Sequence, residues 1–303
     1  MPATLSNLFC IEVIELLDTQ SYFDLLHLPY PAQRSGVLER FASEHLICAN
    51  DDLWTITNLG AILFAKKLDQ FDRLARKAPR VIIYDGTSKL KTKLDTPGAK
   101  GYAVAFKGLV DFIVSHVPSN EVIQQAVRQK VTMFPEIAIR ELVANALIHQ
   151  ELTETGASVM IEIYDDRMEI SYPGVPFIPP DRFIDEFKSR NERLADLMRR
   201  LGICEEKGSG VDKVIQAAEV YQLPAPDFRV TDLRTSVVLF AHKHFEDMDR
   251  EDRVRACYQH CCLRYVMNEK MTNQSLRERF KLPEKKSESV SRMIRDAVEA
   301  DRN

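Results

Sequence analysis

The residues with the clearest capacity for chemistry lie on one predicted helix. From residue 137 to 148 the chain is apolar apart from Arg140, Glu141 and Asn145, so the pattern predicts a largely buried helix over residues 136–150. Glu141 and Asn145 are four residues apart and therefore share one face. A buried carboxylate and amide are costly unless a partner satisfies them. A hydrated metal ion with nucleotide phosphates would do so, and so would Arg140 or a backbone group acting on Glu141.

A glycine-rich turn is the second candidate. Gly208, Ser209 and Gly210 precede a segment predicted to be helical over residues 211–221. The N–H groups of such a turn can close on a phosphate, because the helix N-terminus favours negative charge. The turn lacks the Gly-Lys-Ser/Thr ending of a P-loop and the three glycines of a dinucleotide fingerprint. A joint between two helices, closed by a glycine cap, explains it equally well.

The elements that must position these residues are strands and short helices. Alternating segments at 159–164 and 168–172, separated by an Asp-Asp-Arg turn, predict a β-hairpin. A helix is predicted over 193–201, and the apolar run at 236–240 predicts a buried strand. Upstream, residues 81–84 predict a strand that a lysine-rich polar stretch follows.

The two ends of the chain each predict a helical module. Helices within 11–28 and 32–46, a β-ribbon turning at 50–52, and a helix resuming at Asn58 follow the order of a winged helix. At the other end, helices over 254–266, 273–280 and 289–300 follow helix-turn-helix order, and the sequence ends where a wing would follow. Thr272 or Asn273 is predicted to cap the helix over 273–280.

The C-terminal module is predicted to contact DNA through basic and hydroxyl side chains, because arginine is the usual reader of guanine edges. The candidates are Arg277, Lys285, Lys286, Ser289, Arg292 and Arg295. Use of the module only for protein contacts or dimerisation is the alternative, since a fold does not fix a function.

Taken together, the motifs resemble a known superfamily. Glu-Leu-Val-Ala-Asn-Ala-Leu at 141–147, a hairpin ending in Pro173-Gly174, and Gly-Ser-Gly at 208–210 ahead of an apolar strand resemble the GHKL, or Bergerat-fold, ATPases. Closer still is the likeness to RecG-like C-terminal ATP-binding proteins and transcriptional regulators. The stretches that carry it are Ile56–Ala65, Arg140–His149, Glu162–Gly174, Ser189–Asn191, Leu197–Gly210 and Met271–Phe280. This family often places a Schlafen-type, AlbA-like domain ahead of the segment that starts at residue 1 here.

The resemblance implies a role for each matching residue. Glu141 would be the general base that polarises the water attacking the γ-phosphate, and Asn145 would bind Mg²⁺. Gly208 and Gly210, with Ser209 between them, would wrap the phosphates of ATP. The lid over the nucleotide would run from Gly174 to Gly208. Further nucleotide contacts implied by the resemblance are Tyr172, Gly174, Ser189, Arg190 and Asn191.

The chain departs from the superfamily in the base pocket. The family reads the amino group of adenine with an aspartate two residues before the first glycine of an Asp-x-Gly-x-Gly motif. Tyr172 stands in that place here, and Pro176 replaces the second glycine. A phenol does not reproduce the acceptor geometry of a carboxylate. The pocket is therefore open to remodelling, to another nucleotide, or to loss of its ligand.

The composition and charge of the chain exclude some classes of protein. A chain of 303 residues with a net charge of −4 is not a polycation that coats nucleic acid, although residues 66–130 hold 13 Lys or Arg against 6 Asp or Glu. No apolar run is long enough to cross a bilayer, and the start does not resemble a signal peptide. Six cysteines, three of them at positions 257, 261 and 262, do not suggest a disulfide framework. A cytoplasmic protein is predicted, without a membrane partner.

The sequence thus predicts an α+β protein with a Bergerat-type (GHKL) ATP-binding domain flanked by winged-helix modules. The expected parts are a winged-helix segment at 1–70, a connecting α/β segment at 71–121, the GHKL-like domain at 122–243 and the C-terminal module at 250–303. The predicted function is an ATP- and Mg²⁺-binding, DNA-binding transcriptional regulator that can form a homo-oligomer. A degenerate GHKL scaffold for assembly and an ATPase of DNA repair or defence are the alternatives. A helicase is not expected, because no P-loop is present.

Overall fold

The computed structural model describes residues 3–124, 127–204 and 209–300. Its first part is a helical unit with a small antiparallel sheet, in the order β1-β3-β2. The elements are β1 (Ala3–Leu8), α1 (Cys10–Leu16), α2 (Thr19–Leu25), α3 (Arg34–Ser43), β2 (Ile47–Asn50), β3 (Leu53–Thr57) and α4 (Asn58–Phe64). The predicted ribbon turn and the helix resuming at Asn58 are confirmed, and the Thr57 hydroxyl caps that helix by accepting from the N–H of Gly60. Strand β1 was not predicted.

A six-stranded sheet forms the centre of the molecule, in the order β10-β11-β9-β8-β4-β5. Its strands are β4 (Arg80–Tyr84), β5 (Thr92–Pro97), β8 (Met160–Ile163), β9 (Arg167–Pro173), β10 (Asp227–Val230) and β11 (Arg234–Phe240). Only β4 and β8 pair in parallel; the other described pairs in this sheet are antiparallel. The fold is therefore a mixed-sheet α+β fold.

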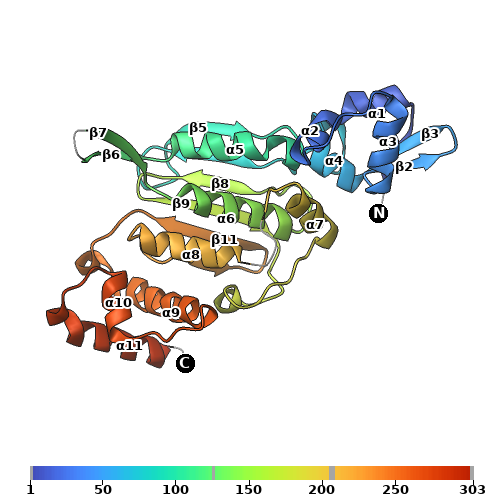
Figure 1. Ribbon diagram of the computed structural model, residues 1–303. Coiled ribbons are helices and arrows are strands. Elements are labelled where there is room, and N and C mark those ends of the chain that lie inside the picture. The colour runs from blue at the N-terminus through green and yellow to red at the C-terminus, as the bar shows by residue number, and fades with distance from the viewer. Residues whose placement is uncertain (1–2, 125–126, 205–208, 301–303) are drawn as a thin grey trace.

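Helices cover one face of this sheet (Figure 1). They are α5 (Tyr102–His116), α6 (Glu136–His149) and α8 (Gly210–Val220), and α6 packs on β9 between the other two. Along β9, Met168, Ile170 and Tyr172 are buried against this layer. Alternation of this kind places every second side chain on the helix side, which is why the sequence predicted the hairpin correctly.

Two strands of the sheet were missed, and both lie at its edges. Strand β5 pairs with β4, and all of its side chains except the half-buried Thr96 are exposed. Strand β10 pairs with β11 and is only partly buried. An edge strand with little buried surface carries no hydrophobic alternation, so a lysine-rich polar stretch was predicted where β5 lies.

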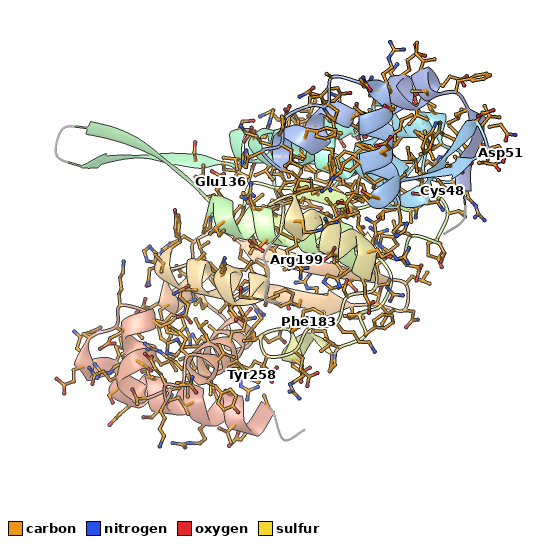
Figure 2. The ribbon with its side chains drawn as sticks, turned by 45° about the vertical axis from the view of Figure 1, so that its right-hand side comes forward. Cys48, Asp51, Glu136, Phe183, Arg199 and Tyr258 are labelled. Carbon is orange, nitrogen blue, oxygen red and sulfur yellow. The ribbon has the colours of Figure 1, made fainter. Side chains whose placement is uncertain are left out.

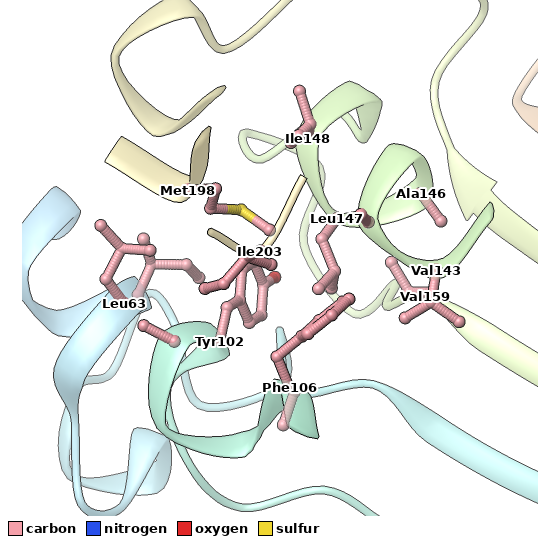
Figure 3. Close-up of a cluster of buried hydrophobic side chains, with 14 of the residues drawn as sticks. Leu63, Tyr102, Phe106, Val143, Ala146, Leu147, Ile148, Val159, Met198 and Ile203 are labelled. Carbon is pink, nitrogen blue, oxygen red and sulfur yellow. The ribbon is translucent and has the colours of Figure 1, made fainter. Parts of the chain in front are cut away.

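A single hydrophobic core joins the first helical unit to the central layer (Figure 3). Leu63 of α4, Tyr102 and Phe106 of α5, and Leu147 of α6 meet there, together with Met198 of α7 (Glu192–Arg200). Gly101 allows the close approach, because a β-carbon there would lie 2.6 Å from the carbonyl of Leu63. No helix within the described residues is long and apolar enough to cross a membrane.

A two-stranded antiparallel sheet, β6 (Ser119–Gln124) with β7 (Val127–Thr132), extends from the body between α5 and α6 (Figure 1). These strands pair with each other and join neither of the other two described sheets.

The last part of the chain is a three-helix unit of α9 (Arg250–Val266), α10 (Asn273–Arg279) and α11 (Ser287–Ala300). Thr272 is the cap of α10, since its hydroxyl accepts from the N–H of Ser275. The unit has a small core of its own, whose members include Cys257, Leu276, Val290 and Met293. The predicted helix order is confirmed.

Candidate functional site

A cavity of about 430 Å³ lies between α6, the segment that follows β9, α7 and the first turn of α8. Among the predicted site residues, those that line it are Glu141, Asn145, Tyr172, Ser189, Arg190 and Gly210. Gly174, Asn191 and Ser209 are not among its described lining residues, and Gly208 lies outside the residues that the structure describes. The structure thus brings the candidate helix and the end of the glycine turn to the same space.

The closest approach in the site is between α6 and Gly210. A β-carbon added to Gly210 would lie 2.8 Å from Oε2 of Glu141 and 3.5 Å from Nδ2 of Asn145. Glu141 is only 6% exposed, whereas Asn145 is half-buried. A larger residue at position 210 would therefore have to displace the Glu141 carboxylate, and both polar side chains of the helix face border the cavity.

The N-terminus of α8 brings a partial positive charge to this part of the cavity wall. Ser209 is the residue that caps α8, but its side chain makes no capping hydrogen bond, and Gly210 begins the helix beside the cavity. The first N–H groups of a helix have no partner within it and carry its positive dipole. They can receive an anion.

Apolar side chains form most of the remaining wall. They come from α6, the segment after β9, and β10, and they include Leu142, Ile148, Phe177, Phe183 and Phe228. Phe183 and Phe228 meet edge to face, with ring centroids 5.5 Å apart. Lys188 and Arg199 add positive charge. None of these residues was predicted, because contacts between a loop and a strand distant in sequence leave no periodic signal.

Tyr172, next to the last residue of β9, lies opposite Thr235 of β11. Burial raises the pKa of its phenol to about 12, although Thr235 and Arg190 act to lower it, so the side chain is neutral at ordinary pH. Thr235 donates its hydroxyl to the carbonyl of Gly174 at 2.8 Å. Gly174 has a φ of 108°, a conformation that favours glycine. This residue shapes the strand end, and Thr235 is a cavity residue that the sequence did not suggest.

The residues 174–191, here called the lid segment, connect β9 to α7. Arg190 joins its two ends, because Nη2 donates to the carbonyl of Val175. Nη1 donates to Glu151, just after α6, at 2.7 Å. Asn191 donates to the carbonyls of Ile148 and Gln150, at 2.7 and 2.9 Å, which satisfies acceptors at the end of α6. Within the described residues, the buried hydroxyl of Ser189 has no hydrogen-bond partner.

His149, the last residue of α6, also lines the cavity. Burial, together with the positive charge of Arg190, lowers the pKa of its imidazole to about 4. The ring is neutral at physiological pH and can offer one nitrogen as donor and the other as acceptor.

The predicted DNA contacts separate into two sets. Lys285, Ser289, Arg292 and Arg295 are exposed, and the last three lie along α11. Arg277, in contrast, is half-buried and donates Nε to Asn273 at 3.0 Å, while Lys286 pairs with Glu246 at 3.4 Å. The exposed set forms the surface that remains open to a phosphate backbone.

Arg279 on α10 is buried, only 5% exposed. It donates to the carbonyl of Leu223 at 2.6 Å and lies 3.6 Å from Glu219 of α8. The same carboxylate lies 2.9 Å from Nδ1 of His260, which is 1% exposed. These contacts tie α8, α9 and α10 together, so the helix that begins at the cavity ends against the C-terminal unit.

Comparison with known proteins identifies the central region. Residues 156–239 match the family described as "Putative ATP-dependent DNA helicase recG C-terminal". This match supports a RecG-like C-terminal family of ATPase type for the matched region. The matched residues include Tyr172, the lid segment and β11, whereas Glu141 and Asn145 lie before them. No curated protein matches the chain.

A solved structure is similar in fold over nearly the whole chain. The crystal structure of the DIP2311 protein from Corynebacterium diphtheriae aligns with a TM-score of 0.61 at 18% sequence identity, and the alignment covers 99% of this chain and 60% of that one. At this identity the likeness concerns the fold alone. The chain spans about 60% of the length of that protein.

Proposed function

We propose that the chain binds Mg·ATP in this cavity and acts as a nucleotide-responsive, DNA-binding transcriptional regulator. The observation that carries the proposal is the meeting of Glu141, Asn145 and Gly210 in the wall of one cavity. The match of residues 156–239 to a family of ATPase type supports a nucleotide as the ligand.

The described residues fit the phosphates and the metal ion. Gly210 leaves a space that a β-carbon would fill, and the hydroxyl of Ser189 is buried without a partner. Asn145 would supply an oxygen ligand, which Mg²⁺ prefers. Bound Mg²⁺ would neutralise phosphate charge. The N–H groups at the start of α8 would donate hydrogen bonds to the phosphate oxygens, and Glu141 would take a proton from a water beside them.

DNA binding is assigned to α11 and the residues before it. Lys285, Arg292 and Arg295 are exposed on one unit, and Ser289 lies on the same helix. Positive side chains on an exposed helix are the usual means of contacting phosphates and base edges. The winged-helix assignment of both terminal units and the Bergerat assignment of the central layer belong to this proposal, as does a cytoplasmic location.

Tyr172 favours a second candidate, a GHKL-like scaffold that has lost its ligand. Its neutral, buried phenol stands where the superfamily has an aspartate. An ATPase of DNA repair or defence is the third reading, and it requires that Glu141 act as a base. The three differ in what the protein binds and in what it releases.

Calorimetry with Mg·ATP and a gel shift with random duplex DNA separate these candidates. The regulator binds both; Asn145→Ala weakens Mg·ATP at least about tenfold, since it removes a ligand of the metal. Glu136→Ala is the matched control, because Glu136 is an exposed acid at the start of the same helix (Figure 2). Steady phosphate release that stops in Glu141→Ala would identify the ATPase. Binding of neither ligand by the wild type would leave the scaffold.

A further inference from the structure

The lid segment is held from outside by α9 of the C-terminal unit. The hydroxyl of Tyr258 donates to the carbonyl of Asp181 at 3.1 Å. Three residues further on, Ile184 is 7% exposed and packs with Leu263 of α9 and Ile215 of α8. These three side chains form a cluster separate from the main core. Both contacts therefore join the lid to the C-terminal unit directly.

Phe183 lies between these two anchor points and turns the other way. It lines the cavity and packs edge to face on Phe228 of β10. In Figure 2 the lid, marked by Phe183, and α9, marked by Tyr258, lie next to each other. Because Asp181 and Ile184 are fixed on α9, the backbone between them has little freedom to move Phe183 out of the cavity wall.

We propose that Tyr258 and Leu263 of α9 are positioning residues for the lid, and that the C-terminal unit thereby controls the affinity of the cavity for its ligand. The identity of that ligand as Mg·ATP rests on the function proposed above; the positioning does not. Ordering a loop costs conformational entropy in each residue. Contacts to α9 order the lid before the ligand binds. The entropy of ordering the lid is therefore not subtracted from the binding free energy of the ligand.

The coupling works in both directions. A ligand that stabilises the lid also stabilises the docking of α9 on it, by the same free energy. Helix α9 packs on α11, where Arg292 and Arg295 are exposed. A partner bound to α11 that shifts α9 therefore changes how well the lid is ordered. The affinity of the cavity for its ligand changes with it.

Amide hydrogen exchange of the full chain tests the positioning without any ligand. In Tyr258→Phe, exchange across residues 177–190 is expected to be about fivefold faster, the effect of one hydrogen bond. In Leu263→Ala it is expected to be at least about tenfold faster, because a buried contact is removed. Exchange in α6 and β9 is expected to stay at the wild-type rate. Tyr265→Phe is the matched control, since Tyr265 is 74% exposed on the same helix.

Calorimetry with Mg·ATP on the same proteins completes the test. The dissociation constant is expected to rise in Tyr258→Phe and Leu263→Ala by the factor found for lid exchange, and to stay unchanged in Tyr265→Phe. Unaltered lid exchange in Tyr258→Phe would overturn the inference, and so would acceleration spread equally over the central sheet. If the wild type binds no Mg·ATP, the proposed function fails, while the exchange rates still decide whether α9 positions the lid.

Discussion

Gly210 lies so close to Glu141 that a β-carbon on the glycine would approach Oε2 of the carboxylate to 2.8 Å. The turn before α8 and the polar face of α6 are thus fitted to each other, and any larger residue must displace the acid. Because the carboxylate is nearly buried, it has little room to move except into the cavity.

Gly210→Ala is therefore expected to weaken Mg·ATP binding at least about tenfold and to lower the free energy of unfolding by about 1–3 kcal/mol, the usual cost of overpacking. Calorimetry and urea unfolding measure the two effects. Gly108→Ala is the control: Gly108 is exposed within α5, and nothing lies within 4 Å of an added β-carbon. That variant is expected to gain up to about 1 kcal/mol from helix propensity. Equal behaviour of the two variants would contradict the close fit.

The imidazole of His149 predicts a pH dependence of stability. Its pKa in the folded protein is about 4, against about 6.5 in an unfolded chain. The unfolded state therefore binds more protons between these values, and the free energy of unfolding falls as the pH falls through this window. From about pH 7.5 to about pH 5.5 the loss from this group is expected to be about 1 kcal/mol.

His149→Gln is expected to remove that part of the pH dependence, because glutamine does not titrate. Urea unfolding of both proteins at the two pH values gives the difference directly. The matched control is His116→Gln on α5, whose ring is exposed. A slope that is the same in wild type and His149→Gln would show that the imidazole is as readily protonated folded as unfolded.

Glu44 and Arg200 connect the first helical unit to α7. The guanidinium donates two hydrogen bonds to the carboxylate, one of 3.0 Å and one of 2.5 Å, and Tyr22 donates a third at 2.9 Å. Arg200 is the main cause of the lowered pKa of Glu44. This carboxylate contributes stability above its unfolded pKa, and the contribution is lost as the pH falls through the folded pKa.

A double-mutant cycle with Glu44→Gln and Arg200→Met is expected to give a coupling free energy of about 1 kcal/mol. The Arg200 side chain is 39% exposed, so the coupling is expected to shrink in about 1 M salt. Urea unfolding of the four proteins measures it. Additive effects of the two substitutions would mean that the pair does not fasten α7 to the first unit.

The sequence allowed prediction of the elements whose hydrophobic pattern reports burial. Helix α6 is apolar on nearly all sides and strand β9 alternates, so both were predictable, and the positions of Glu141 and Asn145 followed from the helix. Strand β5 has no buried face, so it left no signal. Residues of the cavity wall could be predicted only where they belong to a sequence motif. Phe183 and Thr235 are brought to it by the lid segment and by strand register, and neither contact is visible in local spacing.

In the C-terminal unit, charge alone does not separate exposed arginines from those that have protein partners, for the same reason. Arg277 and Arg292 are equally basic in the sequence, but one is held by Asn273 and the other is exposed. Arg279 is buried against Glu219 and the carbonyl of Leu223. Which face of a short helix meets the rest of the protein depends on the neighbouring unit, here α8 and the segment after it, and that neighbour cannot be inferred from the helix itself.

The exposed arginines of α11 yield the last prediction, on the salt dependence of DNA binding. If Arg292 and Arg295 contact phosphates, each replacement by alanine releases about one fewer counterion, and the slope of log Kd against log salt falls by about one. Fluorescence anisotropy with a random duplex, at several salt concentrations, measures the slope for each variant.

Two further variants make this test decisive. Lys107→Ala removes an exposed charge from α5, far along the chain from α11, and is expected to leave the slope unchanged. Arg279→Met removes a charge that is 5% exposed, so it should change the free energy of unfolding, because Glu219 loses a partner, while leaving the slope unaltered in the folded protein. A slope that falls equally in Lys107→Ala and Arg292→Ala would mean that DNA follows total charge rather than the face of α11.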